Sequence, residues 1–306
     1  MEYTATVGGL ADFLNDWAPI GLAESYDNVG LLVGRREWPV ERVLVALDIT
    51  EAVVEEAVQR GVQAVVAHHP VIFNGLKKLV GQSDAVRAVE RAVQSRIALL
   101  AAHTNLDAIA DGVSVHLAHK LGLEQVRILE PRAQQLLNLT VFVPGEALEA
   151  VREAVFAAGA GKVGNYDRCG FSTHGVGTFR PLERANPVVG SIGKEEKVDE
   201  VRLEFLVPKT RRLAVEQALF EAHPYEVVAH FWHEHQGLLE DVGFGAVGYW
   251  PEGKTWNEAV QTVKSSLGLS SMRHSAPPEG LVTCVAVCGG SGSDLLEVAQ
   301  RVGAQL

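Results

Sequence analysis

The chain has 306 residues, of which 47% are hydrophobic and 21% are charged, and its formal net charge is -11. This is the composition of an ordinary globular protein with room for two domains. The negative charge, together with the lack of any run rich in lysine or arginine, excludes nucleic acid as a routine partner.

Signals for secretion or membrane insertion are also lacking. Residues 1–13 carry no basic stretch followed by an apolar core, and no apolar segment reaches transmembrane length. The three cysteines, Cys169, Cys284 and Cys288, are odd in number and lack a zinc-ribbon spacing. We therefore expect a reduced, cytoplasmic protein that contacts no membrane.

The first part of the chain predicts helices and strands in alternation. The helical segments are 10–17, 51–60, 83–95 and 113–121, and the strand-like segments are 43–47, 64–67 and 97–102. Strands that are joined through helices form βαβ units with right-handed crossovers. We assign residues 1–125 to a layered α/β domain.

From about residue 126 the pattern changes to an internal repeat. The segments 141–144 and 205–208 both end in Val-Pro at an offset of 64 residues, and the same offset pairs Val151 with Val215. Each copy predicts a strand, a helix and a second strand. A duplicated unit of this kind is typical of a ferredoxin-like α+β domain, to which we assign residues 126–237.

The last part of the chain is similar in style to the first. It predicts a glycine-containing strand over 238–250, a helix over 256–267, a strand over 281–287 and a helix over 294–302. We expect residues 238–306 to complete the domain that 1–125 begins. The predicted fold class is therefore α/β, a discontinuous layered α/β domain with an inserted ferredoxin-like α+β domain.

Two of the predicted strands end in groups that can bind metal. His68 and His69 follow the strand 64–67, and His103 and Asp107 follow the strand 97–102. Chemistry in open α/β sheets lies at the carboxyl ends of the strands, and imidazole is a common ligand for divalent first-row metals. A histidine pair alone is as consistent with a polar strand end as with a metal site, but the two motifs together favour a metal site.

Two neighbouring positions leave alternatives open. His103 either lines the site or is a plain histidine at a strand end. Asp48 either orients an imidazole or caps the following helix, and capping is the commoner role. Asp27 and Asn28 fit ordinary turn residues.

These motifs resemble those of the NIF-three-like family of dinuclear-metal proteins, the GTP cyclohydrolase 1 type 2 homologues. The matching segments are Asp27-Asn28-Val29-Gly30-Leu31, Ala46-Leu47-Asp48-Ile49-Thr50, His68-His69-Pro70, His103-Thr104-Asn105-Leu106-Asp107 and Val287-Cys288-Gly289-Gly290-Ser291-Gly292. In addition, Gly159-Ala160-Gly161 and His223-Pro224-Tyr225-Glu226 resemble the PII/CutA-like insert of the longer bacterial members.

The resemblance implies a pair of divalent ions per subunit, of zinc, iron, manganese or a similar metal. It implies that His68, His69 and Asp107 are metal ligands and that His103 lines the site. In the family a later His and Glu complete the pair. With the sequence ending at Leu306, we expect that the sequence is truncated, that one ion is less well held, or that a neighbouring subunit supplies ligands. The resemblance also implies a homohexamer.

Two functions follow as hypotheses. The first is a metal-dependent hydrolase that acts on nucleotides or phosphoesters through a metal-bound hydroxide. The second is a non-catalytic metal-binding regulatory or scaffold protein whose inserted domain binds a ligand or partner. The catalytic residues are not readable from the sequence.

Overall fold

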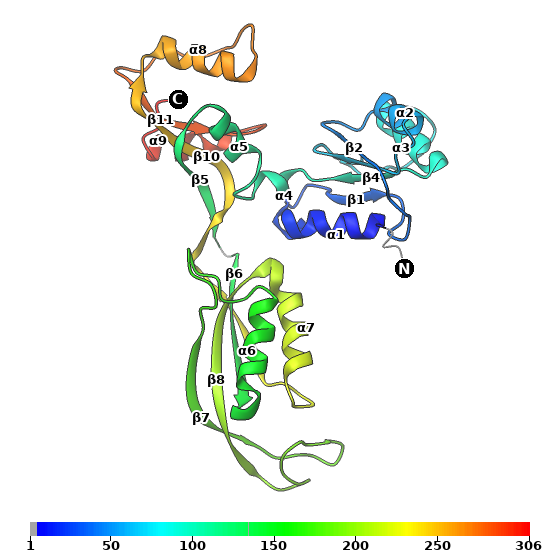
Figure 1. The fold of residues 1–306 in the computed structure, drawn as a ribbon, viewed down its shortest axis with the longest axis vertical. Coiled ribbons are helices and arrows are strands. Elements are labelled where there is room, and N and C mark those ends of the chain that lie inside the picture. Colours follow the sequence, from blue (N-terminus) through cyan, green and yellow to red (C-terminus); the bar gives the residue numbers. More distant parts are fainter. Residues whose placement is uncertain (1–4, 134) are drawn as a thin grey trace. The chain divides into compact units, whose positions relative to one another are not determined.

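A computed structural model describes residues 5–133 and 135–306. The protein is a mixed α/β protein with several sheets, and it divides into two compact units (Figure 1). One unit consists of residues 1–131 and 241–306, and the other of residues 132–240. Among the described residues, no helix is both long and apolar enough to cross a membrane.

A four-stranded sheet with the order β1-β4-β3-β2 carries the first histidines. Its strands are β1 (Gly30–Val33), β2 (Val43–Ala46), β3 (Ala64–Ala67) and β4 (Ala98–Ala101). The strands β2, β3 and β4 run parallel, whereas β1 pairs antiparallel with β4. The carboxyl ends of three strands therefore lie at the same edge, beside the start of β1.

Helices cover both faces of this sheet (Figure 1). On one face, α2 (Glu51–Gln59) and α3 (Asp84–Ser95) pack against alternate strand residues that include Val65 and Leu99. On the other face, α1 (Val7–Trp17) packs against Ala64, Leu100 and their neighbours. Burial on both faces explains why these strands read as continuous apolar runs.

The helices of this sheet begin at the side-chain caps that their sequences supply. The hydroxyl of Thr50 accepts a hydrogen bond from the backbone N–H of Val53 at the start of α2, and that of Ser83 accepts from Val86 at the start of α3. Such caps satisfy N–H groups that the first helical turn leaves unpaired. Thr50 rather than Asp48 thus caps α2.

The same unit contains a second sheet, in which β10 (Leu238–Lys254) lies between β5 (Glu124–Ala133) and β11 (Val282–Val287). The strands β10 and β11 are antiparallel. Trp250 is buried in the associated core, and its indole N–H donates to the carbonyl of Leu121 over 3.0 Å. The remaining helices of the unit are α4 (Thr104–Asp107), α5 (Val113–Lys120), α8 (Trp256–Leu267) and α9 (Leu296–Arg301), with short 3-10 turns at η1 (Ile20–Leu22) and η4 (Ser293–Leu295).

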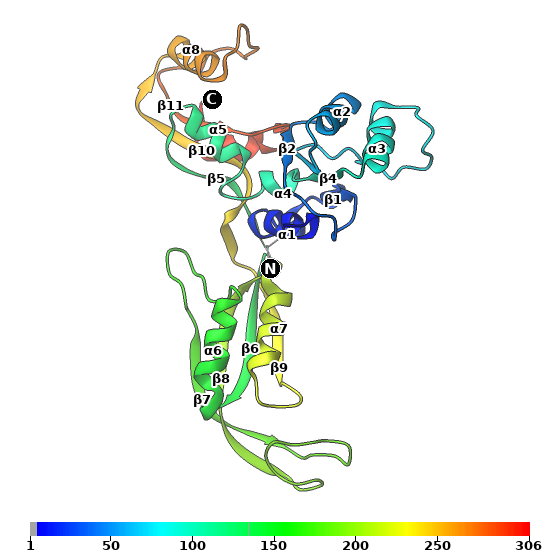
Figure 2. The same ribbon diagram turned by 45° about the vertical axis from the view of Figure 1, so that its right-hand side comes forward.

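The other unit is an antiparallel sheet with the order β7-β8-β6-β9 and two helices (Figure 2). Its elements in chain order are β6 (Leu136–Pro144), η2 (Gly145–Ala147), α6 (Leu148–Ala157), β7 (Phe171–Phe179), β8 (Glu196–Pro208), η3 (Lys209–Arg211), α7 (Arg212–Ala222) and β9 (His230–His235). Val151 of α6 and Val215 of α7, the pair matched by the repeat, are both fully buried against the sheet. The helices pack on the sheet face that carries Val141, Leu203 and Phe205.

Candidate metal centre

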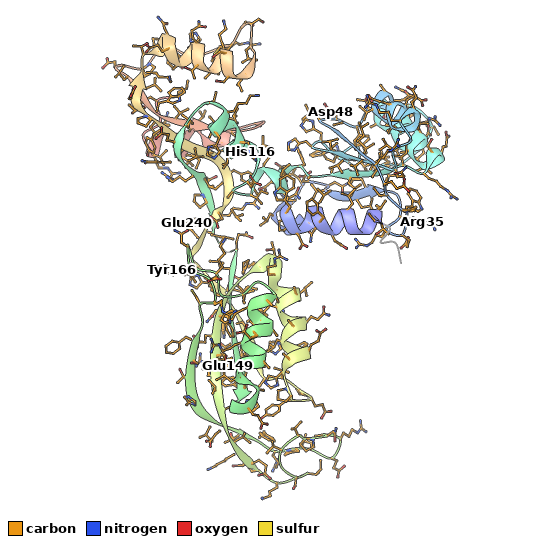
Figure 3. All side chains as sticks on the ribbon, viewed as in Figure 1. Arg35, Asp48, His116, Glu149, Tyr166 and Glu240 are labelled. Atoms are coloured by element: carbon orange, nitrogen blue, oxygen red, sulfur yellow. The ribbon has the colours of Figure 1, made fainter. Side chains whose placement is uncertain are left out.

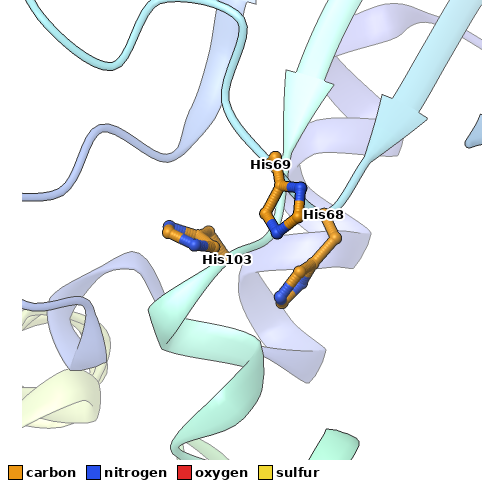
Figure 4. Close-up of side chains that lie close together, drawn as sticks. All are labelled: His68, His69 and His103. Carbon is orange, nitrogen blue, oxygen red and sulfur yellow. The ribbon is translucent and has the colours of Figure 1, made fainter. Parts of the chain in front are cut away.

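Three histidines lie together where β3 and β4 end. His68 and His69 follow β3, and His103 follows β4 directly before α4 (Figure 4). One ring nitrogen from each lies within 4.8 Å of the others, so the group could hold a metal ion. The centroids of the His68 and His103 rings are 5.1 Å apart.

The parallel pairing continues past the strands and fixes the histidine backbones. The N–H of His69 donates to the carbonyl of Leu47 over 3.0 Å, and that of Ala102 donates to the carbonyl of Ala67 over 3.0 Å. Two neighbouring strand ends thus deliver their histidines to one place. This is why two adjacent histidines on a strand can serve one site.

Each imidazole is oriented by a hydrogen bond at Nδ1. His68 Nδ1 lies 2.9 Å from the carbonyl oxygen of Ala102, and His69 Nδ1 lies 2.7 Å from Asp48 Oδ1. His103 Nδ1 lies 2.9 Å from Asp27 Oδ1. A carbonyl and an ionised carboxylate only accept, so Nδ1 carries the proton in all three rings.

Nε2 then presents its lone pair in each neutral ring, the form in which imidazole binds metal. An acceptor behind the ligating ring is the usual companion of a metal-bound histidine, because it fixes the tautomer and the ring orientation. Asp48 lies just beyond the end of β2 (Figure 3), and its register next to His69 follows from the parallel pairing of β2 and β3.

Asp27 is the most enclosed of these acceptors. Its side chain is 0% exposed, and besides His103 it accepts from the backbone N–H of Asn28 over 2.7 Å and from that of Thr104 over 3.1 Å. The Thr104 hydroxyl donates to the same carboxylate. Burial alone would raise the pKa of Asp27, but the hydrogen bonds from Thr104 and His103 outweigh it and lower the pKa below 3.8.

Asp107 adds a carboxylate beside the histidines. It is the last residue of α4, and its Oδ1 lies 3.8 Å from His68 Nε2. Burial raises the pKa of Asp107, and the nearby His68 and His103 oppose that rise. Among the described residues, no group donates a hydrogen bond to this buried oxygen.

A buried carboxylate oxygen without a donor calls for a cation, because its desolvation is otherwise uncompensated. The set of imidazole nitrogens and one carboxylate oxygen matches what zinc, iron or manganese accepts in proteins. The residues present therefore fit the ion that the sequence predicted.

The structure brings together all four residues singled out in the sequence, His68, His69, His103 and Asp107. It groups His103 with the histidine pair, whereas the sequence left open whether His103 lines the site or is a plain histidine at a strand end. Asp27 and Asp48, interpreted mainly as a turn residue and a helix cap, instead accept from histidines. Only the long-range pairing of β1 with β4 brings Asp27 to His103, and no local signal reports it.

A sheet with histidines and a carboxylate at its carboxyl edge defines the class: a mixed α/β protein with a candidate metal centre. The family model Duf34/NIF3 (NGG1p interacting factor 3) matches residues 5–306, and the chain belongs to this family. The family resemblance inferred from the sequence is confirmed.

Sequence relatives and solved structures also support membership of this family. The chain is 38% identical over 291 residues to the GTP cyclohydrolase 1 type 2 homolog of Halalkalibacterium halodurans, covering 95% of this chain and 78% of that protein. It is 37% identical over 298 residues to the homolog of Bacillus subtilis, covering 97% and 80%. A Bacillus cereus protein related to NIF3 is similar in structure, with a TM-score of 0.85 and 38% identity over 98% of this chain and 80% of that one.

Proposed function

We propose that the protein is a metal-dependent hydrolase of nucleotides or phosphoesters. The observation that carries the proposal is the pairing of three imidazoles, each with Nε2 free, with the unpartnered Oδ1 of Asp107. The relatives are named for GTP cyclohydrolase 1 type 2, which favours hydrolysis as the reaction class. No described residue of the site selects guanine over another base.

His68, His69 and Asp107 would be the metal ligands, and His103 would complete the set or line it. A bound divalent ion supplies Lewis acidity toward a phosphoryl or carbonyl oxygen and makes water more acidic. The chain itself supplies orientation: Ala102, Asp48 and Asp27 hold the three rings in the tautomer that is protonated at Nδ1 and leaves the Nε2 lone pair for the ion. Two ions per subunit, one of them less well held, are part of the proposal.

The experiment combines metal content with turnover. Metal per chain is measured by mass spectrometry, and hydrolysis is followed with GTP and with bis(p-nitrophenyl) phosphate for the wild type, His68→Ala and Asp107→Ala. His119→Ala is the matched control, because it removes an exposed imidazole from the last turn of α5. The proposal requires that the two site variants lose both metal and turnover while the control keeps them. Turnover that survives in both site variants contradicts it.

A second candidate is a non-catalytic metal-binding regulatory protein. It is favoured by a cavity in the unit of residues 132–240, which a purely catalytic role leaves unused. Stoichiometric metal without turnover of either substrate would support this candidate over the hydrolase.

We further propose that residues 132–240 form an inserted ferredoxin-like domain of the PII/CutA-like type. The support is the βαββαβ element order with the strand order β7-β8-β6-β9. The resemblance noted in the sequence also supports a cytoplasmic homohexamer, and light scattering on the purified chain tests the hexamer directly.

A further inference from the structure

A cavity of about 570 Å³ lies in the unit of residues 132–240 and is separate from the histidine group in sequence and lining. The strand β7, the loop 180–189, the β8 residues Glu200 and Arg202, and the segment 225–229 bound it. Its volume falls in the range of sites that enclose a small organic ligand.

Backbone contacts make this cavity a built feature of the fold. The N–H of Asn186 donates to Glu226 Oε2 over 2.8 Å, which ties the loop after β7 to the segment after α7. The N–H of Gly193 donates to the carbonyl of Pro181 over 2.7 Å and closes the base of the same loop. The β7–β8 hairpin that carries the loop extends beyond α6 and α7 (Figure 2).

Most of the cavity wall is apolar. It includes aromatic rings and branched aliphatic side chains from β6, β7, the loop and the segment after α7: Phe142, Val176, Phe179, Val188, Val189 and Val227. Gly175 and Gly177 of β7 leave part of the floor without side chains. An apolar group of a ligand is thus accommodated by shape and by desolvation.

The polar groups at the floor are Glu200 and Tyr225. Glu200 is paired with Gly175 across the sheet, and its carboxylate occupies the space that a side chain at Gly177 would fill. The Tyr225 hydroxyl is buried beside the Glu200 carboxylate, and no hydrogen bond of normal geometry is found for it among the described residues. Burial, and then the nearby charge of Glu200, raises the pKa of Tyr225 to about 12.

The charges around the cavity leave Glu200 unbalanced. Arg202, which also lines the cavity, forms an ion pair with Glu204 over 2.5 Å. Glu226 accepts from the loop backbone, and Arg180 is exposed at the start of the loop. Within residues 5–133 and 135–306, no ion pair is found for Glu200. A partly buried anion in an apolar setting is best complemented by a cation that brings its own apolar body.

We propose that this cavity binds an organic amine, whose ammonium group donates to Glu200 and to the Tyr225 hydroxyl oxygen while its apolar body contacts the surrounding rings and valines. The ammonium group gives the Tyr225 oxygen a donor and Glu200 a counter-charge. The proposal is independent of the metal centre and of any hydrolytic activity.

The test uses two probes of similar size and opposite charge on the full chain at neutral pH. Titration calorimetry with 2-phenylethylamine is expected to show saturable binding of one molecule per chain. The matched anion, 3-phenylpropanoate, is expected to bind at least about ten-fold more weakly, because it places a carboxylate against Glu200. Equal or tighter binding of the anion would overturn the proposal, since Arg180 would then dominate recognition.

Variants locate the binding. Glu200→Gln keeps the shape and removes the charge, and it is expected to weaken amine binding about ten-fold or more. Glu195→Gln is the control, because it removes an exposed acid from the same hairpin outside the cavity. Circular dichroism verifies that both variants fold. Amine binding that is absent from the wild type, or that Glu200→Gln leaves unchanged, refutes the assignment. If the wild type binds no amine but self-associates in light scattering, and Glu200→Lys abolishes that self-association, the occupant of the cavity is a second copy of the chain rather than an amine.

Discussion

Replacing Asp27 by asparagine tests whether the buried carboxylate behind His103 supports the metal centre. The introduced amide would keep one oxygen for His103 and Asn28, but it would place an NH₂ group where Asp27 Oδ2 now accepts from Thr104. Donors would then face donors in a site that is closed to solvent. One lost charge-assisted hydrogen bond costs about 1.5–3 kcal/mol, and an unsatisfied buried donor about 1–3 kcal/mol.

We therefore expect Asp27→Asn to lower the free energy of unfolding by about 2.5–6 kcal/mol and metal affinity about 10–100-fold. Because the pKa of Asp27 is lowered in the folded state, its stabilising contribution is present above pH 3.8 and is lost as the pH falls further. The variant should lose this part of the acid dependence.

The assays are urea unfolding of the metal-free protein and competition for Zn²⁺ or Mn²⁺ with a chelator. Asp48→Asn is the matched comparison, because Asp48 also accepts from a histidine but its side chain is 58% exposed. It should affect metal affinity with little change in stability. Metal affinity of Asp27→Asn within two-fold of the wild type would show that His103 needs no carboxylate behind it.

Three further results are expected. Asp107→Asn should leave the metal-free protein at least as stable as the wild type at pH 7, because a carboxyl whose pKa is raised in the folded state destabilises the fold when it is ionised. The same change should abolish stabilisation by metal. A metal-free variant that is less stable than the wild type in urea contradicts this reasoning. Saturating metal at about 100 times its dissociation constant should stabilise the wild type and His119→Ala by about 2.7 kcal/mol in thermal melts, reversibly with a chelator, and a melt that does not move argues against a site. Burial lowers the pKa of His223, whose Nε2 lies 2.9 Å from the Phe142 carbonyl oxygen and whose Nδ1 accepts from the backbone N–H of Tyr225, so its contribution to stability is present above pH 6.5 and is lost below it. His223→Gln should therefore reduce the fall in the free energy of unfolding between pH 7.5 and 5.5. An unchanged pH dependence excludes His223 as its source.

The sequence predicted the part of the site that depends on neighbouring strands. His68, His69, His103 and Asp107 could be placed together because parallel strands joined by helices end at the same edge. The acceptors behind the rings escaped prediction for two different reasons. Asp48 competes locally with Thr50 for the start of α2, and Asp27 reaches His103 only through a strand that joins the sheet out of sequence order.

The fold shows the same division between local and long-range signals. The offset of 64 residues predicted equivalent helices in the middle of the chain, and Val151 and Val215 occupy equivalent buried positions. The strands near 238–250 and 281–287 were also predicted. The sequence did not predict that these two strands form a separate sheet with β5, because the pairing of distant strands leaves no periodic pattern in either segment.

The acceptors behind the three rings differ in their access to water, and this bears on how fast an ion would leave. Asp48 and His69 have side chains that are 58% and 47% exposed, whereas those of Asp27 and His103 are 0% and 19% exposed. Solvent can compete for the hydrogen bond between Asp48 and His69, whereas the bond between Asp27 and His103 is shielded from it. Cation release should therefore start at His69 rather than at His103 or at His68, whose side chain is 20% exposed, which makes the first step of unloading a property of the scaffold.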